Sequence, residues 1–252
     1  MDMEKMVGHN FLAKLGKTRL RPGGVTATKW LIHQGHFSSK MKVLDVACNM
    51  CTTSIELAKS FHCHITALDL EKKNLEKAKI NIANNNVENF IDLIQGNALK
   101  LPFEDNCFDI VINEAMLTML NNKAKEKALK EYYRVLKPGG KLLTHDITFY
   151  DENLVTPIDK LKETININVC PLPIDEWEKL IKQSGFSSVK YDTGDMTLMS
   201  FQGMIKDEGL LNTIRIIKNG QKKENKIMFK KMHKFFTTEG KQLKYIALCS
   251  EK

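Results

Sequence analysis

The most informative run in this chain is Val43-Leu44-Asp45-Val46-Ala47-Cys48-Asn49-Met50-Cys51. Its apolar start with one carboxylate indicates a buried strand, and the small residues that follow indicate a loop leading into a helix. In open α/β sheets, ligands bind outside the carboxyl ends of the strands, near the point where the strand order reverses. The run therefore predicts the first strand of a parallel sheet with a ligand-binding loop at its end.

Apolar runs alternate with helical patterns along the rest of the chain. This alternation is typical of βαβ units and predicts an α/β fold with a parallel sheet. Strands are expected at residues 42–47, 64–70, 90–96, 108–113, 141–147, 188–192 and 244–249. Helices are expected between them at residues 52–61, 71–84, 123–136 and 175–184.

Two segments stand outside this alternation. Residues 1–40 are expected to form an N-terminal helical cap, followed by the ligand-binding domain at residues 41–252. Within that domain, residues from about 195 to 240 form an expected insertion with helical patterns near 210–217 and 225–236. The second pattern is basic and amphipathic, a type that binds membranes in some proteins but more often packs on its own domain.

A second carboxylate lies about twenty residues after the first motif, because Asp69 ends the expected second strand. A carboxylate at this place can accept hydrogen bonds from both hydroxyls of a ribose. The two motifs together predict a nucleoside-containing cofactor. The plainer alternatives are that Asp69 caps the helix at 71–84 and that Asp45 only orients the loop through backbone N–H groups.

Four ordered motifs resemble those of class I S-adenosylmethionine (SAM)-dependent methyltransferases, and most of all the ubiquinone/menaquinone-type small-molecule branch. They are Asp45-Val46-Ala47-Cys48-Asn49-Met50-Cys51, then Asp69, then Gly96-Asn97-Ala98 with Leu101-Pro102-Phe103, and finally Arg134-Val135-Leu136-Lys137-Pro138-Gly139-Gly140. The resemblance runs from about residue 40 to 150 and continues loosely to the end. It implies a Rossmann-like, seven-stranded, mostly parallel sheet with helices on both faces and an antiparallel terminal strand.

The chain departs from the family pattern in the first motif, whose usual form is Asp-x-Gly-x-Gly-x-Gly. All three glycines are replaced, by Ala47, Asn49 and Cys51. Glycine is used there because it tolerates a positive φ and lets the backbone approach a ligand. Asn is the non-glycine residue that best tolerates this conformation, and Ala and Cys are small. We expect the loop to persist with some strain.

The resemblance implies SAM as cofactor and the residues that bind it. These are Asp45, Ala47, Cys48, Asn49, Asp69, Leu70, Asn97, Ala98 and Asn113. His145 and Glu114, at the ends of two strands, are the candidate catalytic residues, with His145 as general base. The alternatives are a His145 bonded to the backbone, a Glu114 that lines the methionine side of the cofactor pocket, and a turn role for Asn97.

The cysteine content favours a reducing setting. Cys48 and Cys51 formally match a redox or half-zinc pattern, but no second Cys-x-x-Cys and no His-x-x-x-His accompanies them, so no metal site is expected. Six cysteines in 252 residues without a recognisable secretory signal are not a disulfide framework, which predicts a cytoplasmic protein. No run reaches the roughly 18–20 apolar residues of a membrane helix, so no membrane span is expected.

The net charge is +8, and residues 206–252 hold 12 basic against 5 acidic residues. In the whole chain only four of the 38 basic residues are Arg, the type preferred for phosphate and base contacts. This composition favours a solvated Lys-rich surface over a nucleic-acid partner. Nucleic-acid amino-methylating enzymes usually carry Asn/Asp-Pro-Pro-Tyr/Phe after the fourth strand, where this chain has Asn113-Glu114-Ala115-Met116. This difference favours a small-molecule acceptor. Candidate apolar lining residues are Met199, Phe201, Met204, Phe229, Met232 and Phe236, with packing in the protein core as the alternative.

Two other functions stay open at this point, together with the oligomeric state. One is an RNA or protein methyltransferase that uses the basic C-terminal region, and the other is a SAM-fold binding or redox protein without methyl transfer. The turn Arg21-Pro22-Gly23-Gly24 is expected at a lid or pocket edge, where Arg21 pairs with a carboxylate of the cofactor or of an acidic substrate. The alternative is a helix-capping turn.

Overall fold

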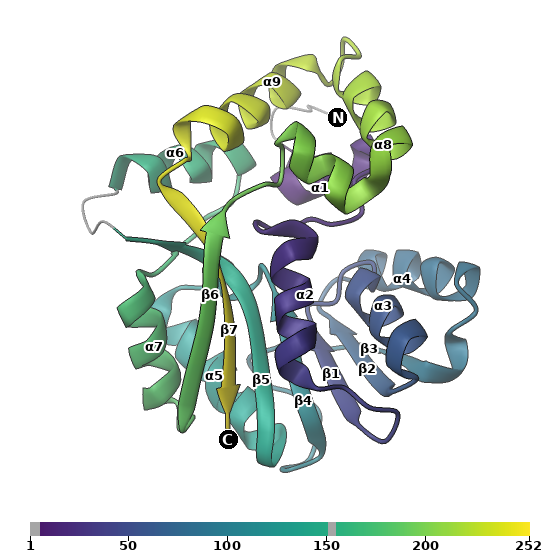
Figure 1. Ribbon diagram of the computed structural model, residues 1–252, viewed down its shortest axis with the longest axis vertical. Coiled ribbons are helices and arrows are strands. Elements are labelled where there is room, and N and C mark those ends of the chain that lie inside the picture. The colour runs from purple at the N-terminus through teal and green to yellow at the C-terminus, as the bar shows by residue number, and fades with distance from the viewer. Residues whose placement is uncertain (1–5, 151–154) are drawn as a thin grey trace.

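The computed structural model describes residues 6–150 and 155–252, and seven strands in these segments form one mixed sheet (Figure 1). The strand order is β3-β2-β1-β4-β5-β7-β6. The strands are β1 (Lys42–Val46), β2 (His64–Asp69), β3 (Ile91–Gln95), β4 (Phe108–Glu114), β5 (Leu136–Phe149), β6 (Ser188–Asp195) and β7 (Leu243–Glu251). Strands β1 to β5 pair in parallel, whereas β7 is antiparallel to both β5 and β6. The predicted Rossmann-like sheet is confirmed.

Helices cover both faces of the sheet because residues alternate between the faces along each strand. Val43 of β1 packs into a core with α2 (Gly24–Gly35), α3 (Thr52–Phe61) and α4 (Lys72–Asn84). The next residue, Leu44, packs into the opposite core with α5 (Asn122–Val135) and α7 (Ile174–Gln183). Two short 3₁₀ helices, η2 (Glu88–Phe90) and η3 (Leu117–Met119), lie in the connections.

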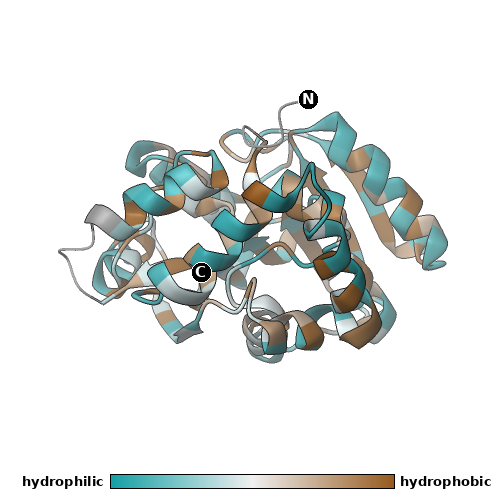
Figure 2. Ribbon diagram, turned by 90° about the horizontal axis from the view of Figure 1, so that it is seen from above, coloured by the Kyte–Doolittle hydropathy of each residue, from teal (hydrophilic) through white to brown (hydrophobic). Residues whose placement is uncertain are grey.

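A separate group of helices gathers at one end of the molecule, at the top of Figure 1. It contains α1 (Gly8–Leu15), α6 (Val155–Ile165), α8 (Phe201–Gly220), α9 (Lys226–Lys234) and the π-helical turn η4 (Phe235–Glu239). These elements share a third core, which includes Phe11, Leu161, Met204 and Phe235. Seen from above in Figure 2, the helices carry hydrophobic and hydrophilic residues side by side, as amphipathic helices do. We call this group the helical layer.

The helical layer differs from the expected elements in three ways. Helix α6 was not expected from the sequence. Its first turn contains Pro157, a residue tolerated only near the start of a helix. Helix α8 extends well beyond the pattern at 210–217, with a kink at Gly209, where φ is 75° and ψ is 164°. Of the expected N-terminal cap, residues 1–5 lie outside the described residues. The described part divides between two places, since α1 lies in the helical layer whereas α2 packs on the sheet against β5 and β7.

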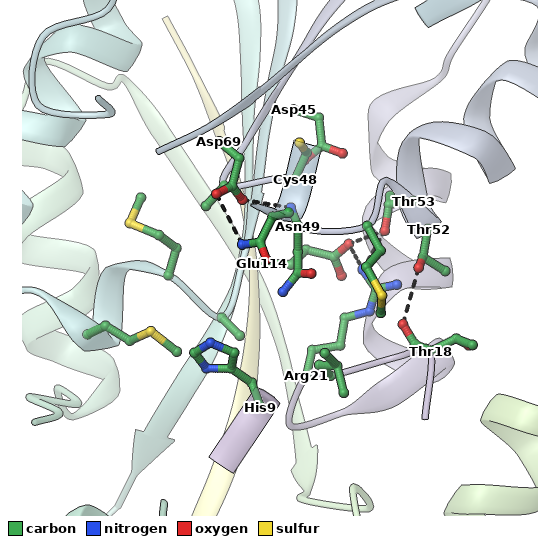
Figure 3. A pocket seen from close by; sticks show the side chains of 17 residues that line it. His9, Thr18, Arg21, Asp45, Cys48, Asn49, Thr52, Thr53, Asp69 and Glu114 are labelled. Atoms are coloured by element: carbon green, nitrogen blue, oxygen red, sulfur yellow. Dashed lines mark hydrogen bonds and ion pairs between the residues drawn. The ribbon is translucent and has the colours of Figure 1, made fainter. Parts of the chain in front are cut away.

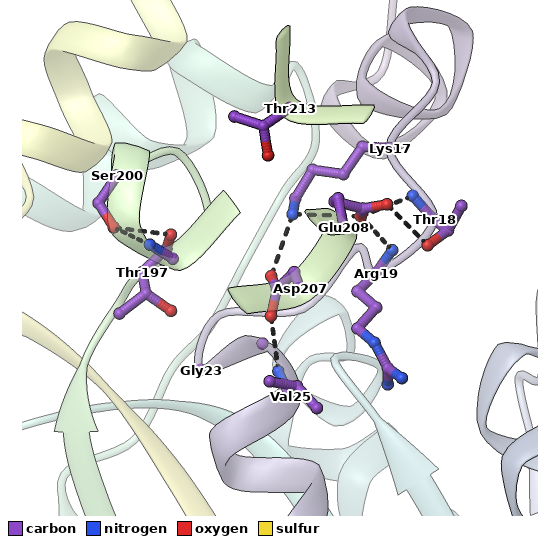
Figure 4. Close-up of polar contacts among 12 residues, drawn as sticks. Lys17, Thr18, Arg19, Gly23, Val25, Thr197, Ser200, Asp207, Glu208 and Thr213 are labelled. Carbon is purple, nitrogen blue, oxygen red and sulfur yellow. Dashed lines mark hydrogen bonds and ion pairs between the residues drawn. The ribbon is translucent and has the colours of Figure 1, made fainter. Parts of the chain in front are cut away.

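A buried ion cluster ties the connection between α1 and α2, residues 16–23, to α8 (Figure 4). Nζ of Lys17 lies 3.1 Å from Oδ2 of Asp207 and 3.5 Å from Oε1 of Glu208, and all three side chains are almost wholly buried. Asp207 also accepts the backbone N–H of Val25 at 2.7 Å. Glu208 accepts the backbone N–H of Thr18 at 2.8 Å. The cluster therefore fixes the course of the chain between α1 and α2.

Among the described residues, no helix combines the length and the apolar character needed to cross a membrane.

Candidate functional site

A cavity opens at the carboxyl ends of β1, β2 and β4, next to the point where the strand order reverses between β1 and β4 (Figure 3). Parallel strands end at the same edge of a sheet, so residues distant in sequence meet there. We call it the first cavity. It is lined by His9, Thr18, Leu20, Arg21, Asp45, Ala47, Cys48, Asn49, Met50, Thr52, Thr53, Asp69, Asn74, Glu114, Ala115, Met116 and Met119.

The loop after β1 keeps a glycine-like backbone without any glycine. Ala47, Asn49 and Cys51 all adopt the left-handed conformation, with φ values of 59°, 48° and 58°. Each such non-glycine residue costs roughly 1 kcal/mol relative to glycine. The loop is held in place by backbone bonds, because Cys48 donates to the carbonyl of Leu68 at 3.1 Å and Cys51 donates to that of Cys48 at 2.8 Å. The expected persistence of the loop with strain agrees with these angles.

Asp69 lies at the end of β2 and is 6% exposed, with its carboxylate in the first cavity. Its Oδ2 accepts the backbone N–H of Asn49 at 2.9 Å. Its Oδ1 accepts the backbone N–H of Glu71 at 2.9 Å and the side chain of Asn74 at 3.2 Å. A carboxylate has about four acceptor positions, so Oδ2 retains one for a ligand. Asp69 is not the N-cap of α4, because that position is Glu71.

Asp45 is buried beneath the loop and accepts a hydrogen bond from the hydroxyl of Ser54 on α3. Burial raises the pKa of Asp45 to about 7, against the lowering effect of the Ser54 hydrogen bond. Near neutral pH this carboxyl is therefore balanced between its protonated and ionised forms.

Glu114, at the end of β4, forms a buried ion pair with Arg21 from the connection between α1 and α2. It also accepts hydrogen bonds from Thr53 at 2.6 Å and from Thr28 at 2.7 Å. Burial alone would raise its pKa, but Arg21 and the hydrogen bond from His145 lower the pKa of Glu114 to about 2. Glu114 is therefore an ionised anchor for Arg21 and a poor proton acceptor near neutral pH.

The expected pocket-edge position of Arg21 agrees with its place in the wall of the first cavity. Within the protein, its Nη1 donates hydrogen bonds to Glu114 and Thr53. Its Nε is buried and has no hydrogen-bond partner within the described part of the chain. Arg21 is 7% exposed, and its cationic side chain forms part of the wall of the first cavity, where it favours an anionic ligand group.

His145 on β5 lies outside the residues that line the first cavity and is fully buried. Its Nε2 accepts the backbone N–H of Gly23 at 3.0 Å, and its Nδ1 lies 3.1 Å from Oε2 of Glu114. Since Nε2 accepts, Nδ1 carries the proton and donates it to Glu114. Both ring nitrogens are thus engaged, which matches the backbone-bonded alternative. The geometry gives His145 a structural role beneath Glu114 and leaves it no nitrogen for an acceptor molecule.

The remaining predicted cofactor residues lie outside the wall of the first cavity. Leu70 is 58% exposed, Asn97 is exposed and bonds the backbone N–H of Leu99 at 2.9 Å, and Ala98 follows it. Leu70 follows β2, and Asn97 and Ala98 lie beyond the end of β3, the edge strand of the sheet. Asn113 is fully buried, donates to Thr144 at 3.0 Å, and has an unpartnered Oδ1 among the described residues.

Cys48 and Cys51 are free thiols and both are buried. The hydrogen bond with Cys51 and burial raise the pKa of Cys48 well above its usual value, which disfavours the reactive thiolate. Within residues 6–150 and 155–252, no group of three or more His, Cys, Asp or Glu side chains is placed to hold a metal ion.

A second cavity adjoins the first and lies between the sheet and the helical layer. The two cavities share His9, Leu20, Ala115 and Met119. The wall of the second cavity is mainly apolar and is completed by Gly8, Leu12, Pro22, Thr118, Asp146, Ile147, Leu161, Ile165, Ile167, Val169, Leu198, Met232 and Phe236. Of the apolar residues expected to line an acceptor site, Met232 and Phe236 do so, whereas Met199 is buried in the core of the helical layer. Phe201, Met204 and Phe229 line a different hollow on the helical layer.

Several residues that line the first cavity were not predicted from the sequence, some for lack of a signal and others because a signal was overlooked. His9, Thr18 and Leu20 precede the first strand and reach the site only because α1 packs into the helical layer and Lys17 pairs with α8. Thr52 and Thr53 begin α3 directly after the loop, so a polar helix start beside a ligand-binding loop was a usable signal. Met116 and Met119 follow β4 and could be found by extending the strand-end rule past Glu114.

Comparisons with known proteins bear on the fold and the protein class. The family model described as a Methyltransferase domain matches residues 44–144. An uncharacterized protein of Haemophilus influenzae is 53% identical over 246 residues, which cover 98% of either chain. The demethylmenaquinone methyltransferase of Lactiplantibacillus plantarum is 36% identical over 132 residues, or 52% of this chain and 55% of that enzyme. The chain thus matches about half the length of that named relative.

A solved structure of phosphoethanolamine N-methyltransferase 2 from Haemonchus contortus, bound to phosphomonomethylethanolamine and S-adenosylhomocysteine, has the same fold, with a TM-score of 0.74. It is 16% identical, and the match covers 92% of this chain and 54% of that one. With the strand order and the match of the family model, this places the chain among the class I SAM-dependent methyltransferases.

Proposed function

We propose that this protein transfers the methyl group of SAM to a small, largely apolar molecule. The single observation that carries this proposal is the meeting of the two cavities, one polar and lined by the family's cofactor motifs, the other mainly apolar. Methyl transfer needs its two reactants held side by side and shielded from water. The residues shared by the two cavities, among them Ala115 and Met119, would lie at the point of transfer.

The first cavity fits the cofactor in its donor and acceptor groups. Asp69 would accept a ribose hydroxyl on its remaining acceptor position, and the cationic side chain of Arg21 in the cavity wall would attract the carboxylate of the methionine part. Asn49 and Cys48 would line the cofactor through the left-handed loop. When bound, SAM supplies a methyl group activated by its sulfonium, and the protein supplies position and a dry surrounding. Leu70, Asn97, Ala98 and Asn113 are weaker candidates, because they lie outside the cavity wall.

The second cavity is the proposed acceptor site. Its wall is apolar apart from His9, Thr118 and Asp146, which suits an apolar molecule with one polar group. Its small-molecule character is in keeping with the relatives named for methylation of demethylmenaquinone and ubiquinone/menaquinone precursors. A cytoplasmic location remains a prediction from the sequence.

The proposal is tested with purified protein, methyl-labelled SAM and a small-molecule extract of bacterial cells, with products resolved by mass spectrometry. Ile167→Trp narrows the second cavity at a half-buried position, so labelled product should be lost while the affinity for S-adenosylhomocysteine stays within about threefold. Ile227→Trp is the matched control. Ile227 lies on α9 and is 62% exposed, so this variant should behave as wild type. Label only in RNA or protein, or no labelled product at all, would overturn the proposal.

A further inference from the structure

We propose that His9 is the general base of this reaction and takes the proton from the acceptor atom that receives the methyl group. This inference rests on the proposed function, because it assigns a role within the proposed acceptor site. His9 belongs to α1 and lies in the wall of both cavities. Figure 3 shows its imidazole pointing into the first cavity from the α1 side. Of the described histidines, it alone lines either of these cavities.

The ring nitrogens of His9 are available, unlike those of His145. No hydrogen bond or ion pair joins His9 to another described residue, and its side chain is only partly buried. Both nitrogens of His145, by contrast, are bonded to Gly23 and Glu114 within the protein. A general base must reach the proton that it removes. At the junction of the two cavities, His9 meets this requirement and His145 does not.

The surroundings of His9 keep its imidazole neutral and thus able to accept a proton. Burial lowers the pKa of His9, the charge of Asp69 partly opposes this, and Lys77 adds to the lowering. His9 is also the second residue of α1, where the positive end of the helix dipole disfavours an imidazolium. His9 also lines a surface hollow between α1 and α4, together with Lys14, Glu71 and Lys73. The other titratable groups in the walls of the two cavities are Arg21, Asp45, Cys48, Glu114 and Asp146.

The proton balance of the step is simple. The acceptor atom forms a bond to the methyl carbon, and the bond between that carbon and sulfur breaks with its electron pair left on sulfur. The proton on the acceptor atom passes to a ring nitrogen of His9, which afterwards releases it to water. No oxidant, reductant or metal is needed. The second cavity holds one other titratable group, Asp146, whose fully buried carboxyl accepts the backbone N–H groups of Thr118 and Ile147.

The test compares wild type, His9→Gln and His9→Ala with the labelled cofactor and the same bacterial small-molecule extract. We expect His9→Gln to lower the rate of methyl transfer about 100-fold or more, while the affinity for S-adenosylhomocysteine by calorimetry changes by less than about threefold. The wild-type rate should fall with decreasing pH as His9 becomes protonated, and the residual rate of His9→Gln should lack that limb. Added imidazole should partly restore His9→Ala. His233→Gln, at an exposed position on α9, is the matched control.

A second readout is independent of turnover. Diethyl pyrocarbonate modifies neutral imidazoles, so peptide mapping should find His9 modified at neutral pH and protected by S-adenosylhomocysteine. A fully active His9→Gln variant in the presence of an active wild type would overturn the role of His9 and leave the proposed function standing. A wild type that methylates nothing in the extract would overturn the proposed function, and the assignment of His9 with it.

Discussion

The backbone N–H of Asn49 donates to Oδ2 of Asp69 at 2.9 Å, and this bond joins the loop after β1 to the end of β2. The two motifs that the family uses for its cofactor are therefore coupled even without a ligand. Because the donor is a backbone group, any side chain at position 49 can make this bond, provided that the left-handed φ of 48° is kept. The loop thus depends on its backbone conformation more than on glycine itself.

Asp69→Asn should weaken cofactor binding and also destabilise the loop. The amide group offers only one acceptor oxygen, so its NH₂ would face either the N–H of Asn49 or the donors from Glu71 and Asn74. We expect the affinity for S-adenosylhomocysteine to fall about 10- to 100-fold and the free energy of unfolding to fall by about 1–3 kcal/mol. Calorimetry and urea denaturation measure the two effects.

Asp92→Asn on β3 is the control for this change. Its carboxylate is 65% exposed and pairs with His64, away from the cavity. This variant should leave the affinity unchanged and alter the stability by less than about 0.5 kcal/mol. Equal affinities for wild type and Asp69→Asn would remove Asp69 from the cofactor site.

Restoring glycine in the loop should preserve cofactor binding. In Asn49→Gly, relief of roughly 1 kcal/mol of left-handed strain is offset by the greater freedom of the unfolded chain, so stability should change by less than about 1 kcal/mol. Cys51→Gly removes a wholly buried thiol, and the lost packing should make it the less stable variant by about 1 kcal/mol. Both should bind S-adenosylhomocysteine at least as tightly as wild type.

Asn86→Gly provides the comparison for Asn49→Gly, since Asn86 has a φ of 54° and lies exposed after α4, outside the cavity. The two variants should match in thermal stability. A large loss of affinity in folded Asn49→Gly would mean that the carboxamide itself contacts the cofactor.

The parts of the site that follow from local sequence were predictable. Apolar runs predicted the seven strands. Because parallel strands end at the same edge of a sheet, Asp45, Asp69 and Glu114 were then expected to lie close together, as they do in the first cavity. Asn97 was expected from the family motif, but it follows β3, the edge strand, and the cavity centres on the ends of β1 and β4. Strand ends alone do not tell which of them a ligand cavity covers.

The rest of the site depends on long-range packing. His9 reaches the cavity because α1 packs into the helical layer with elements about 200 residues later in the chain. His145 was a reasonable base from its place on β5, yet Gly23 and Glu114, distant in sequence, occupy both of its nitrogens. Periodicity within one segment carries no information on such partners.

Lys17→Met should destabilise the protein strongly. The variant leaves the carboxylates of Asp207 and Glu208 buried without their cation, a loss that typically costs about 3–5 kcal/mol. Because residues 16–23 carry Thr18, Leu20 and Arg21 into the first cavity, the affinity for S-adenosylhomocysteine should fall as well. Hydrogen exchange should show loss of protection in this segment.

Lys206→Met tests whether burial is the cause. Lys206 also links α8 to α2, through the hydroxyl of Thr26 at 2.8 Å, but this contact is exposed. Its loss should change the free energy of unfolding by less than about 0.5 kcal/mol. Similar losses in both lysine variants would show that the ion cluster adds nothing beyond an exposed contact.

Asp45 should make the protein less stable as the pH rises from about 4 to 7. Its folded-state pKa of about 7 lies above the ordinary value of 3.8, so between these values the folded state holds a proton that the unfolded state has released. Stability then falls with rising pH. Glu114, with its pKa lowered from 4.5 to about 2, acts in the opposite sense and in a different range, since its contribution is lost as the pH falls from about 4.5 toward 2.

Asp45→Asn isolates this effect, because the amide cannot ionise and its oxygen can still accept the hydroxyl of Ser54. The quantity to follow is the difference in free energy of unfolding, wild type minus variant. This difference should be constant below about pH 4, decline between about pH 4 and 7, and be constant again above about pH 7. A shift of about three pKa units limits the total decline to roughly 4 kcal/mol. Urea denaturation at a series of pH values measures this difference, and parallel curves for the two proteins would refute a buried, proton-holding Asp45. With the curves diverging as described, the carboxyl beneath the loop is protonated in a large fraction of molecules at pH 7.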